Sequence, residues 1–158
     1  MGIETMSITR AELIETIMYY FNEHIPFNKL VGIVVDEVST EEVVLRFSMK
    51  PELVGNTFKG ILHGGVTSTV LDVAGGLVAM INAIDRVFQS DPSLIQEKMS
   101  KIGTIDMRVD YLRPGYGNEF TARAKVIRHG KKIAVTRMEL RNEQGEEIAL
   151  GTATYLVG

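Results

Sequence analysis

The feature that most constrains this chain is a long central segment that carries almost no charge. Between Ile61 and Ile84 the sequence has no Lys, Arg or Glu, and its one ionised side chain is Asp72. A helix that is apolar on all sides either spans a membrane, for which about 20 residues suffice, or forms the core of a folded domain. The glycines of the segment and the soluble pattern of its flanks favour a buried core helix over about residues 63–83.

Alternating apolar and polar residues predict strands on both sides of this helix. Before it, residues 31–38 are apolar and β-branched and residues 42–49 alternate, so the two are expected to form a hairpin. After it, turn residues separate four more strand-like segments, at residues 105–111, 120–126, 132–141 and 147–157. A sheet of about six strands has one apolar face to cover, and the long helix can cover it.

The expected fold is therefore α+β, with a curved antiparallel sheet of about six strands wrapped around one long buried helix. This is the hotdog architecture; another α+β roll and a split-sheet sandwich are the alternatives. A chain of 158 residues is expected to form one domain over residues 1–158.

Two helical additions to this core are predicted. Residues 1–27 form an N-terminal helix that starts with a capping box at Thr9. Residues 85–103 form a helical insertion, in which a polar helix over about residues 92–101 is closed by Gly103.

Composition and charge exclude several classes of function. The chain has 17 Lys and Arg against 20 Asp and Glu, so its net charge is −3 and it lacks the basic field of a nucleic-acid-binding protein. It has no Cys, which excludes thiolate nucleophiles and cysteine zinc sites. His24, His63 and His129 lack ligand spacing, so no metal or redox cofactor is expected. The N-terminus lacks a secretion signal, and we expect a cytoplasmic protein without stable membrane insertion.

The chemistry is expected at the start of the central helix, where His63 precedes Gly64 and Gly65. The first N–H groups of a helix have no partner within the helix, and the helix dipole adds positive charge there. Two glycines let a ligand oxygen approach the backbone closely, which suits an anion or a developing oxyanion. Asp72 lies eight residues after Gly64, or about 12 Å along the helix, which is too far to serve the same carbonyl. A two-fold dimer with antiparallel helices would place Asp72 of one subunit beside the other subunit's glycines.

These residues carry a family resemblance. Asn56, the His63–Gly65 run, Asp72 and the segment at residues 110–114 together resemble the hotdog-fold acyl-CoA thioesterases of the PaaI-like type. Within that family the insertion and residues 99–106 resemble the bacterial medium- and long-chain enzymes. The resemblance implies an acyl-CoA substrate and a homodimer or dimer of dimers with sites at the subunit interface.

The resemblance also implies a role for each site residue. Asp72 matches the carboxylate that acts as nucleophile or general base, and the Gly64 N–H matches the oxyanion donor. His63 matches a residue that shapes the loop and bonds the substrate. Asn56 matches an amide that positions the nucleophile or water, although it lies seven residues before His63 where the family has six.

Further residues are predicted to bind substrate. Gly65 allows close approach, and Ser90 is a candidate second polar helper. Arg113 is predicted to contact the phosphates of coenzyme A. Basic side chains of the turn predicted at residues 128–132 are expected to do the same; they are Arg128, Lys131 and Lys132. A solvated hairpin tip is the alternative for the turn.

Two other functions remain open. One is an enoyl or 3-hydroxyacyl thioester hydratase-dehydratase on the same fold, and the other is a non-catalytic acyl-CoA binding protein. Aliphatic and Met side chains dominate the predicted core, and Leu94, Ile95 and Met99 of the insertion could close over a tunnel. A preference for medium to long acyl chains is therefore expected.

Overall fold

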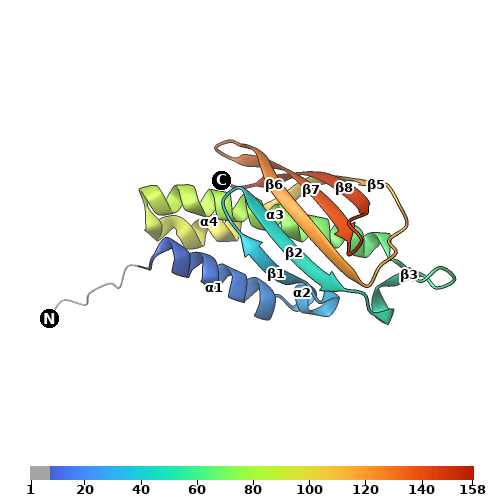
Figure 1. Cartoon of the computed structure of the whole chain (residues 1–158). Helices are drawn as coiled ribbons and strands as arrows, with labels where there is room; N and C mark the ends of the chain where they lie inside the picture. The colour runs from blue at the N-terminus through green and yellow to red at the C-terminus, as the bar shows by residue number, and fades with distance from the viewer. Residues whose placement is uncertain (1–7) are drawn as a thin grey trace.

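In the computed structural model, which describes residues 8–158, one antiparallel sheet wraps around a single long helix (Figure 1). The six strands of the sheet lie in the order β1-β2-β6-β7-β8-β5. Their bounds are β1 Val34–Val38, β2 Glu42–Ser48, β5 Gly103–Tyr111, β6 Glu119–His129, β7 Ile133–Asn142 and β8 Glu147–Leu156. The predicted α+β hotdog arrangement is confirmed, including the β1–β2 hairpin.

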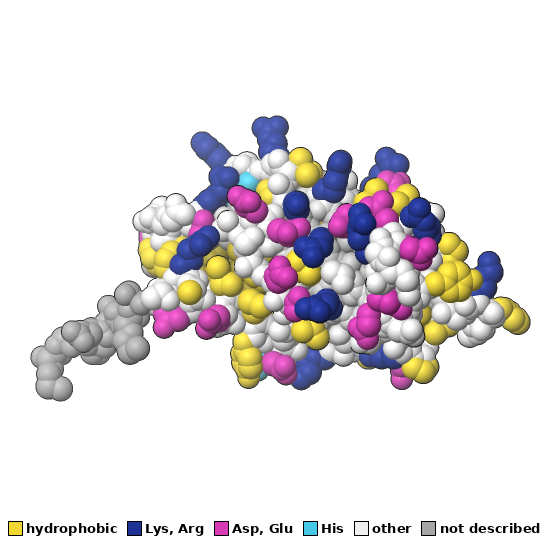
Figure 2. Space-filling view, in the orientation of Figure 1, with side chains coloured by type: hydrophobic (Ala, Val, Ile, Leu, Met, Phe, Trp, Pro, Cys, Tyr) yellow, Lys and Arg dark blue, Asp and Glu magenta, His cyan; other side chains and the backbone are white. Residues whose placement is uncertain are grey.

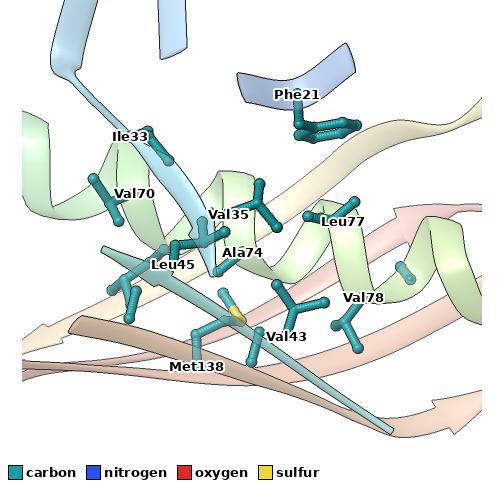
Figure 3. Close-up of a cluster of buried hydrophobic side chains, with 14 of the residues drawn as sticks. Phe21, Ile33, Val35, Val43, Leu45, Val70, Ala74, Leu77, Val78 and Met138 are labelled. Carbon is teal, nitrogen blue, oxygen red and sulfur yellow. The ribbon is translucent and has the colours of Figure 1, made fainter. Parts of the chain in front are cut away.

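The central helix, α3, spans Gly64–Ser90, and one of its faces is buried against the sheet. Figure 3 shows Val70, Ala74, Leu77 and Val78 of this helix among side chains of β1 and β2 and Met138 of β7. Helix α3 is long and apolar enough to cross a membrane. In this fold, however, its apolar face is buried against the sheet and forms the centre of the core.

The end of α3 differs from the prediction. The helix continues past Ala83 to Ser90, so the first residues of the predicted 85–103 insertion belong to α3. Asp85 pairs with Arg10 of the N-terminal helix, and this contact supports the polar end of α3. Charged residues on the exposed side of a helix need not end it, and here they do not.

The rest of the insertion is short. It consists of a 3-10 turn at Pro92–Leu94, helix α4 at Ile95–Lys101, and Ile102, which caps α4 in an extended conformation. Gly103 does not close the helix as predicted but opens β5, where it pairs with Leu156 of β8. Ile95 and Met99 pack against the core, whereas Leu94 is exposed.

The N-terminal segment forms two helices where one was predicted. Helix α1 spans Arg10–Glu23, and its capping box at Thr9 is confirmed. Pro26 then starts a second helix, α2, at Pro26–Val31, and Gly32 ends it with a positive φ of 88°. The prediction of a strand from Val31 was therefore wrong for its first residues, because proline favours a first helical turn and glycine a left-handed helix end.

A small second sheet precedes α3. The residues before the helix, for which no strand was predicted, form a 3-10 turn at Pro51–Leu53 and a two-stranded hairpin of β3 Val54–Asn56 and β4 Ile61–Leu62. The backbone of β3 packs directly on the helix start, since a Cβ at Gly55 would lie 2.6 Å from the His63 Cα.

The outer face of the large sheet is a surface of mixed charge. Figure 2 shows positive and negative side chains interspersed over this face. Glu42 of β2, for example, lies within 3.5 Å of both Arg123 and Lys125 of β6. The sheet therefore has one apolar face toward α3 and one polar face toward solvent.

Strand β5 lies at one edge of the sheet, and its outer side has no neighbouring strand among residues 8–158. Met107 and Val109 are half-buried toward the core, as the alternation predicted, but Ile105 is 53% exposed. A register shift between Thr104 and Asp106 turns Ile105 off the inner face. A long edge with exposed backbone groups is a surface for pairing with another strand.

Candidate active site

The start of helix α3 leaves one backbone donor free. His63 is the N-cap, and its ring Nδ1 accepts a hydrogen bond of 2.8 Å from the Gly65 N–H. The His63 carbonyl accepts from the next two N–H groups. Within residues 8–158 the Gly64 N–H has no hydrogen-bond partner, so of the two predicted glycines it is Gly64 that can offer its N–H to a ligand.

Tyr111, at the end of β5, lies against Gly64. Its hydroxyl donates a hydrogen bond of 2.9 Å to the Gly64 carbonyl, and a Cβ at Gly64 would lie 3.3 Å from the tyrosine ring. The tyrosine is 55% exposed. Tyr111 lies in the 110–114 segment that carries the family resemblance, but its contact with Gly64 was not predicted, because it depends on β5 running past the helix start.

Asp72 lies further along α3 and is half-buried. Its Oδ1 accepts hydrogen bonds from the Thr104 hydroxyl (2.9 Å) and the Tyr155 hydroxyl (3.0 Å). No Lys, Arg or His among the described residues forms an ion pair with it. A half-buried carboxylate without a cation is not explained by a structural ion pair, which favours a functional role.

Tyr155 of β8 is the partner that sequence analysis missed. Burial, together with the negative charge of Asp72, raises the pKa of its phenol, so the hydroxyl remains protonated and can donate. Its approach requires Gly75, because a Cβ there would lie 2.5 Å from the tyrosine oxygen. The group that Gly75 admits is therefore Tyr155 of its own chain.

Asp72 also lines an apolar groove between α3 and the N-terminal helices. The groove has a volume of about 270 Å³ and includes the side chains of Phe21, Ile25, Phe27, Leu77, Met80 and Ile102. A second hollow of about 450 Å³ contains His63 and Gly65. Phe27 of α2 lines both, so the two hollows adjoin at this side chain.

Asn56 lies apart from both hollows. Its side-chain oxygen accepts from the backbone N–H groups of Phe58 and Lys59, at 3.1 and 3.2 Å, and closes the turn between β3 and β4. Within one chain the structure brings His63, Gly64 and Gly65 together, but it does not bring Asn56 to Asp72.

The predicted phosphate contacts fall at opposite ends of α3. Arg113 follows β5 near the Gly64 end, and its guanidinium donates to the Glu147 carbonyl at 2.7 Å. Lys131 and Lys132 belong to the β6–β7 turn, and Arg128 lies at the end of β6 beside it. His129, the last residue of β6, contacts Asn82. Asn82 is 18 residues beyond Gly64, or roughly 27 Å along the helix.

Ser90 is also distant from the carboxylate. It is the last residue of α3, and its hydroxyl donates to the carbonyls of Arg86 and Val87 at 3.2 Å. It lies 18 residues beyond Asp72, again roughly 27 Å along the helix. The structure therefore does not bring Ser90 to Asp72 within one chain.

Taken together, the wrapped helix, its free N-terminal donor and the half-buried carboxylate define a protein of the hotdog class. The Thioesterase superfamily model matches residues 59–149. The medium/long-chain acyl-CoA thioesterase YigI of Escherichia coli is 42% identical over 151 residues, which cover 96% of this chain and 97% of the relative. The chain belongs to the thioesterase superfamily, and the predicted family is confirmed.

Solved structures agree with this assignment. A crystal structure of a Shewanella oneidensis protein related to the thioesterase superfamily is 47% identical, with a TM-score of 0.90 over 94% of this chain and 97% of that chain. The E. coli PaaI protein from the phenylacetic acid degradation operon has a TM-score of 0.74 at 21% identity, over 94% of each chain, and shows the shared fold.

His129, which contacts Asn82 of α3, leads to a prediction about how stability depends on pH. Burial, with the charges of Arg86 and Lys98, lowers the pKa of His129 from 6.5 to about 4. The unfolded chain therefore binds more protons than the folded chain between about pH 4 and 6.5, so stability falls as the pH decreases through this window. His129→Gln should reduce this loss of stability. Urea unfolding at several pH values measures the free energy of unfolding of both proteins. If the variant shows the same pH dependence as the unsubstituted protein, the loss does not come from His129.

Proposed function

We propose that this protein hydrolyses medium- to long-chain acyl-CoA to a free fatty acid and coenzyme A, in the cytoplasm. The observation that carries the proposal is Asp72, a carboxylate that has no cation partner within residues 8–158 and lines an apolar groove. The 42% identity to an enzyme named for this reaction supports the same substrate class.

The active unit in this proposal is a homodimer, alone or as half of a dimer of dimers. Strand β5 begins beside Asp72, through Thr104, and ends beside Gly64, through Tyr111. If the free edges of two β5 strands pair antiparallel about their middle, the start of one strand lies opposite the end of the other. Asp72 of one subunit then approaches Gly64 of the partner subunit, which resolves the separation of about 12 Å within one helix.

The chemistry follows from these two groups. The thioester carbonyl oxygen accepts from the free Gly64 N–H, and the positive end of the helix dipole stabilises the oxyanion as it forms. Asp72 attacks the carbonyl carbon, or removes a proton from a water that attacks it. The tetrahedral intermediate then expels the thiolate of coenzyme A. In the water route the thiolate takes up the proton that Asp72 removed, and the fatty acid is formed directly. In the nucleophilic route the acyl group stays on Asp72 as a mixed anhydride, the thiolate takes up a proton from solvent, and a water then hydrolyses the anhydride to the fatty acid and the free carboxylate. None of these steps requires a metal or redox cofactor.

The remaining predicted residues orient the substrate in this proposal. His63 uses Nδ1 as the helix cap, so its Nε2 is the atom that can bond the substrate. Gly65 keeps the backbone accessible beside it. Asn56 can contribute only from the subunit that supplies Gly64, since it lies away from Asp72 in its own chain. Ser90 lies roughly 27 Å from Asp72 and roughly 39 Å from Gly64 along α3, so it can contribute only from a further subunit, in a dimer of dimers.

The phosphates of coenzyme A are assigned to basic side chains. Arg113 can contact them at the Gly64 end of the site. Arg128, Lys131 and Lys132 can contact them only where the assembled subunits bring the β6–β7 turn toward the mouth of a site. Exposed phosphate contacts of this kind weaken with added salt.

The groove supports an aliphatic acyl chain. Its apolar lining lies next to Asp72, and each buried methylene contributes about 0.8 kcal/mol. Ile102, directly after helix α4, contributes to the lining, so the insertion takes part in the groove through this residue, while Leu94 is exposed to solvent.

Asp72→Asn should lower turnover by about 10³-fold, because it removes the charge that either mechanism needs while nearly conserving shape. Asp85→Asn, on the same helix but paired with Arg10, is the matched control and should keep its activity. Thiol release from acyl-CoA measures turnover. Wild-type turnover in Asp72→Asn would refute the assignment, and hydration of enoyl-CoA without thiol release would favour the hydratase alternative. Acyl-CoA binding without either reaction would favour a binding protein.

Gly64→Pro tests the oxyanion donor itself, because proline has no N–H. Proline is favoured at the first helical position, and His63 before it already has an extended backbone at φ −64°, ψ 133°, so folding should be retained. We expect kcat to fall by about 10²- to 10³-fold. Gly64→Ala adds a Cβ but keeps the N–H and should lose far less. Equal losses of kcat in Gly64→Pro and Gly64→Ala would show that the added side-chain atoms, and not the missing N–H, cause the effect.

Met80 tests the acyl groove. Met80→Ala should enlarge the groove and move the optimum of kcat/KM toward longer saturated chains, and Met80→Phe should move it toward shorter ones. Met107, a half-buried methionine of β5 outside the groove lining, provides the control variant Met107→Ala. A chain-length profile that neither Met80 variant shifts would show that the acyl chain lies elsewhere.

A further inference from the structure

Asp72 is anchored by only one of its two carboxylate oxygens. Its Oδ1 accepts from Thr104 Oγ1 at 2.9 Å and from the Tyr155 hydroxyl at 3.0 Å. Within residues 8–158 no side chain or backbone group donates to Oδ2. A carboxylate held in this way has one fixed oxygen and one that is free to react.

The tyrosine is placed for this contact by features of its own chain. Tyr155 is 1% exposed, and its hydroxyl also lies 3.0 Å from the main-chain oxygen of Asp72. Gly75 leaves the space that the hydroxyl occupies, and Thr136 and Met138 of β7 border the same space. A phenol buried at a helix has to find polar partners, and here its partners are Oδ1 and the main-chain oxygen of Asp72.

The second donor comes from a different element. Thr104 lies at the start of β5, the strand whose outer edge is unpaired among the described residues. Its backbone pairs with Tyr155 of β8, so the two donors to Oδ1 come from directly neighbouring positions in the sheet. The carboxylate is therefore fixed to two adjacent strands and does not depend on the helix alone.

We propose that Tyr155 is a positioning residue for the thioesterase reaction: with Thr104 it fixes Oδ1 of Asp72 and leaves Oδ2 as the oxygen that attacks the thioester or activates water. The inference rests on the proposed function. Neither hydroxyl exchanges a proton with the substrate in this scheme.

Tyr155→Phe tests the proposal, since it removes one oxygen and leaves the ring in the core. We expect kcat to fall by about 10- to 100-fold with little change in KM, because a hydrogen bond to a charged group is lost. A merely structural role for Tyr155 would lower stability and leave kcat per folded enzyme unchanged.

A variant at Thr104, the other donor to Oδ1, tests the positioning role independently if Tyr155→Phe does not fold. Thr104→Val removes the hydroxyl and should also lower kcat with little change in KM, whereas Thr104→Ser keeps the hydroxyl and should retain the wild-type kcat. A wild-type kcat in Tyr155→Phe, or in Thr104→Val, would overturn the proposal.

Failure of the positioning role can be distinguished from failure of the proposed function. If Asp72→Asn is inactive while Tyr155→Phe and Thr104→Val behave like wild type, Asp72 is catalytic and only the positioning role is wrong. If Asp72→Asn keeps its turnover, the proposed site itself is wrong.

Discussion

The structure depends on a single helix that has to serve as both core and active-site scaffold. Helix α3 buries one face against the sheet, so its start and its exposed side are the parts left for chemistry. The N-cap histidine uses the second glycine N–H and leaves the first one free. The separation of Gly64 and Asp72 is set by the rise of the helix, at about 12 Å, and no side-chain rotation can remove it. A site that uses both groups therefore requires a second subunit.

Glycines in α3 are explained by their neighbours in space. Gly64 leaves room for Tyr111, and Gly75 leaves room for the Tyr155 hydroxyl. Each glycine within a helix costs about 1 kcal/mol against alanine, a cost that is offset here by contacts that reach a main-chain carbonyl or the carboxylate. The same sheet that covers the helix thus brings hydroxyl groups to both ends of the Gly64–Asp72 segment.

The sequence predicted the architecture well because periodicity reports burial directly. The alternating strands and the uncharged segment were enough to place a six-stranded sheet around one helix. Boundaries were predicted less well: α3 continues through Asp85, whose pairing with Arg10 is invisible in the local pattern. Helix α2 was missed because its six residues are too few for a periodic signal, although Pro26 and Gly32 mark its ends.

The site was predicted in part. The free N–H at Gly64 follows from helix geometry, whereas the donors to Asp72 come from β5 and β8, far away in sequence. Gly75 and Gly76 were local signals of Tyr155, since glycines inside a helix indicate a close neighbour without identifying it. The separation of Arg113 from the β6–β7 turn likewise depends on tertiary structure.

The central claim, that each site combines Asp72 of one subunit with Gly64 of the partner subunit, is tested most directly by mixing two inactive variants. Asp72→Asn and Gly64→Pro, unfolded together and refolded in equal amounts, should form hybrid dimers with one intact site. Random assortment predicts recovery of about a quarter of wild-type activity. If hybrids form, as subunit-specific tags can establish, and no activity returns, both groups act within one chain and the account is wrong.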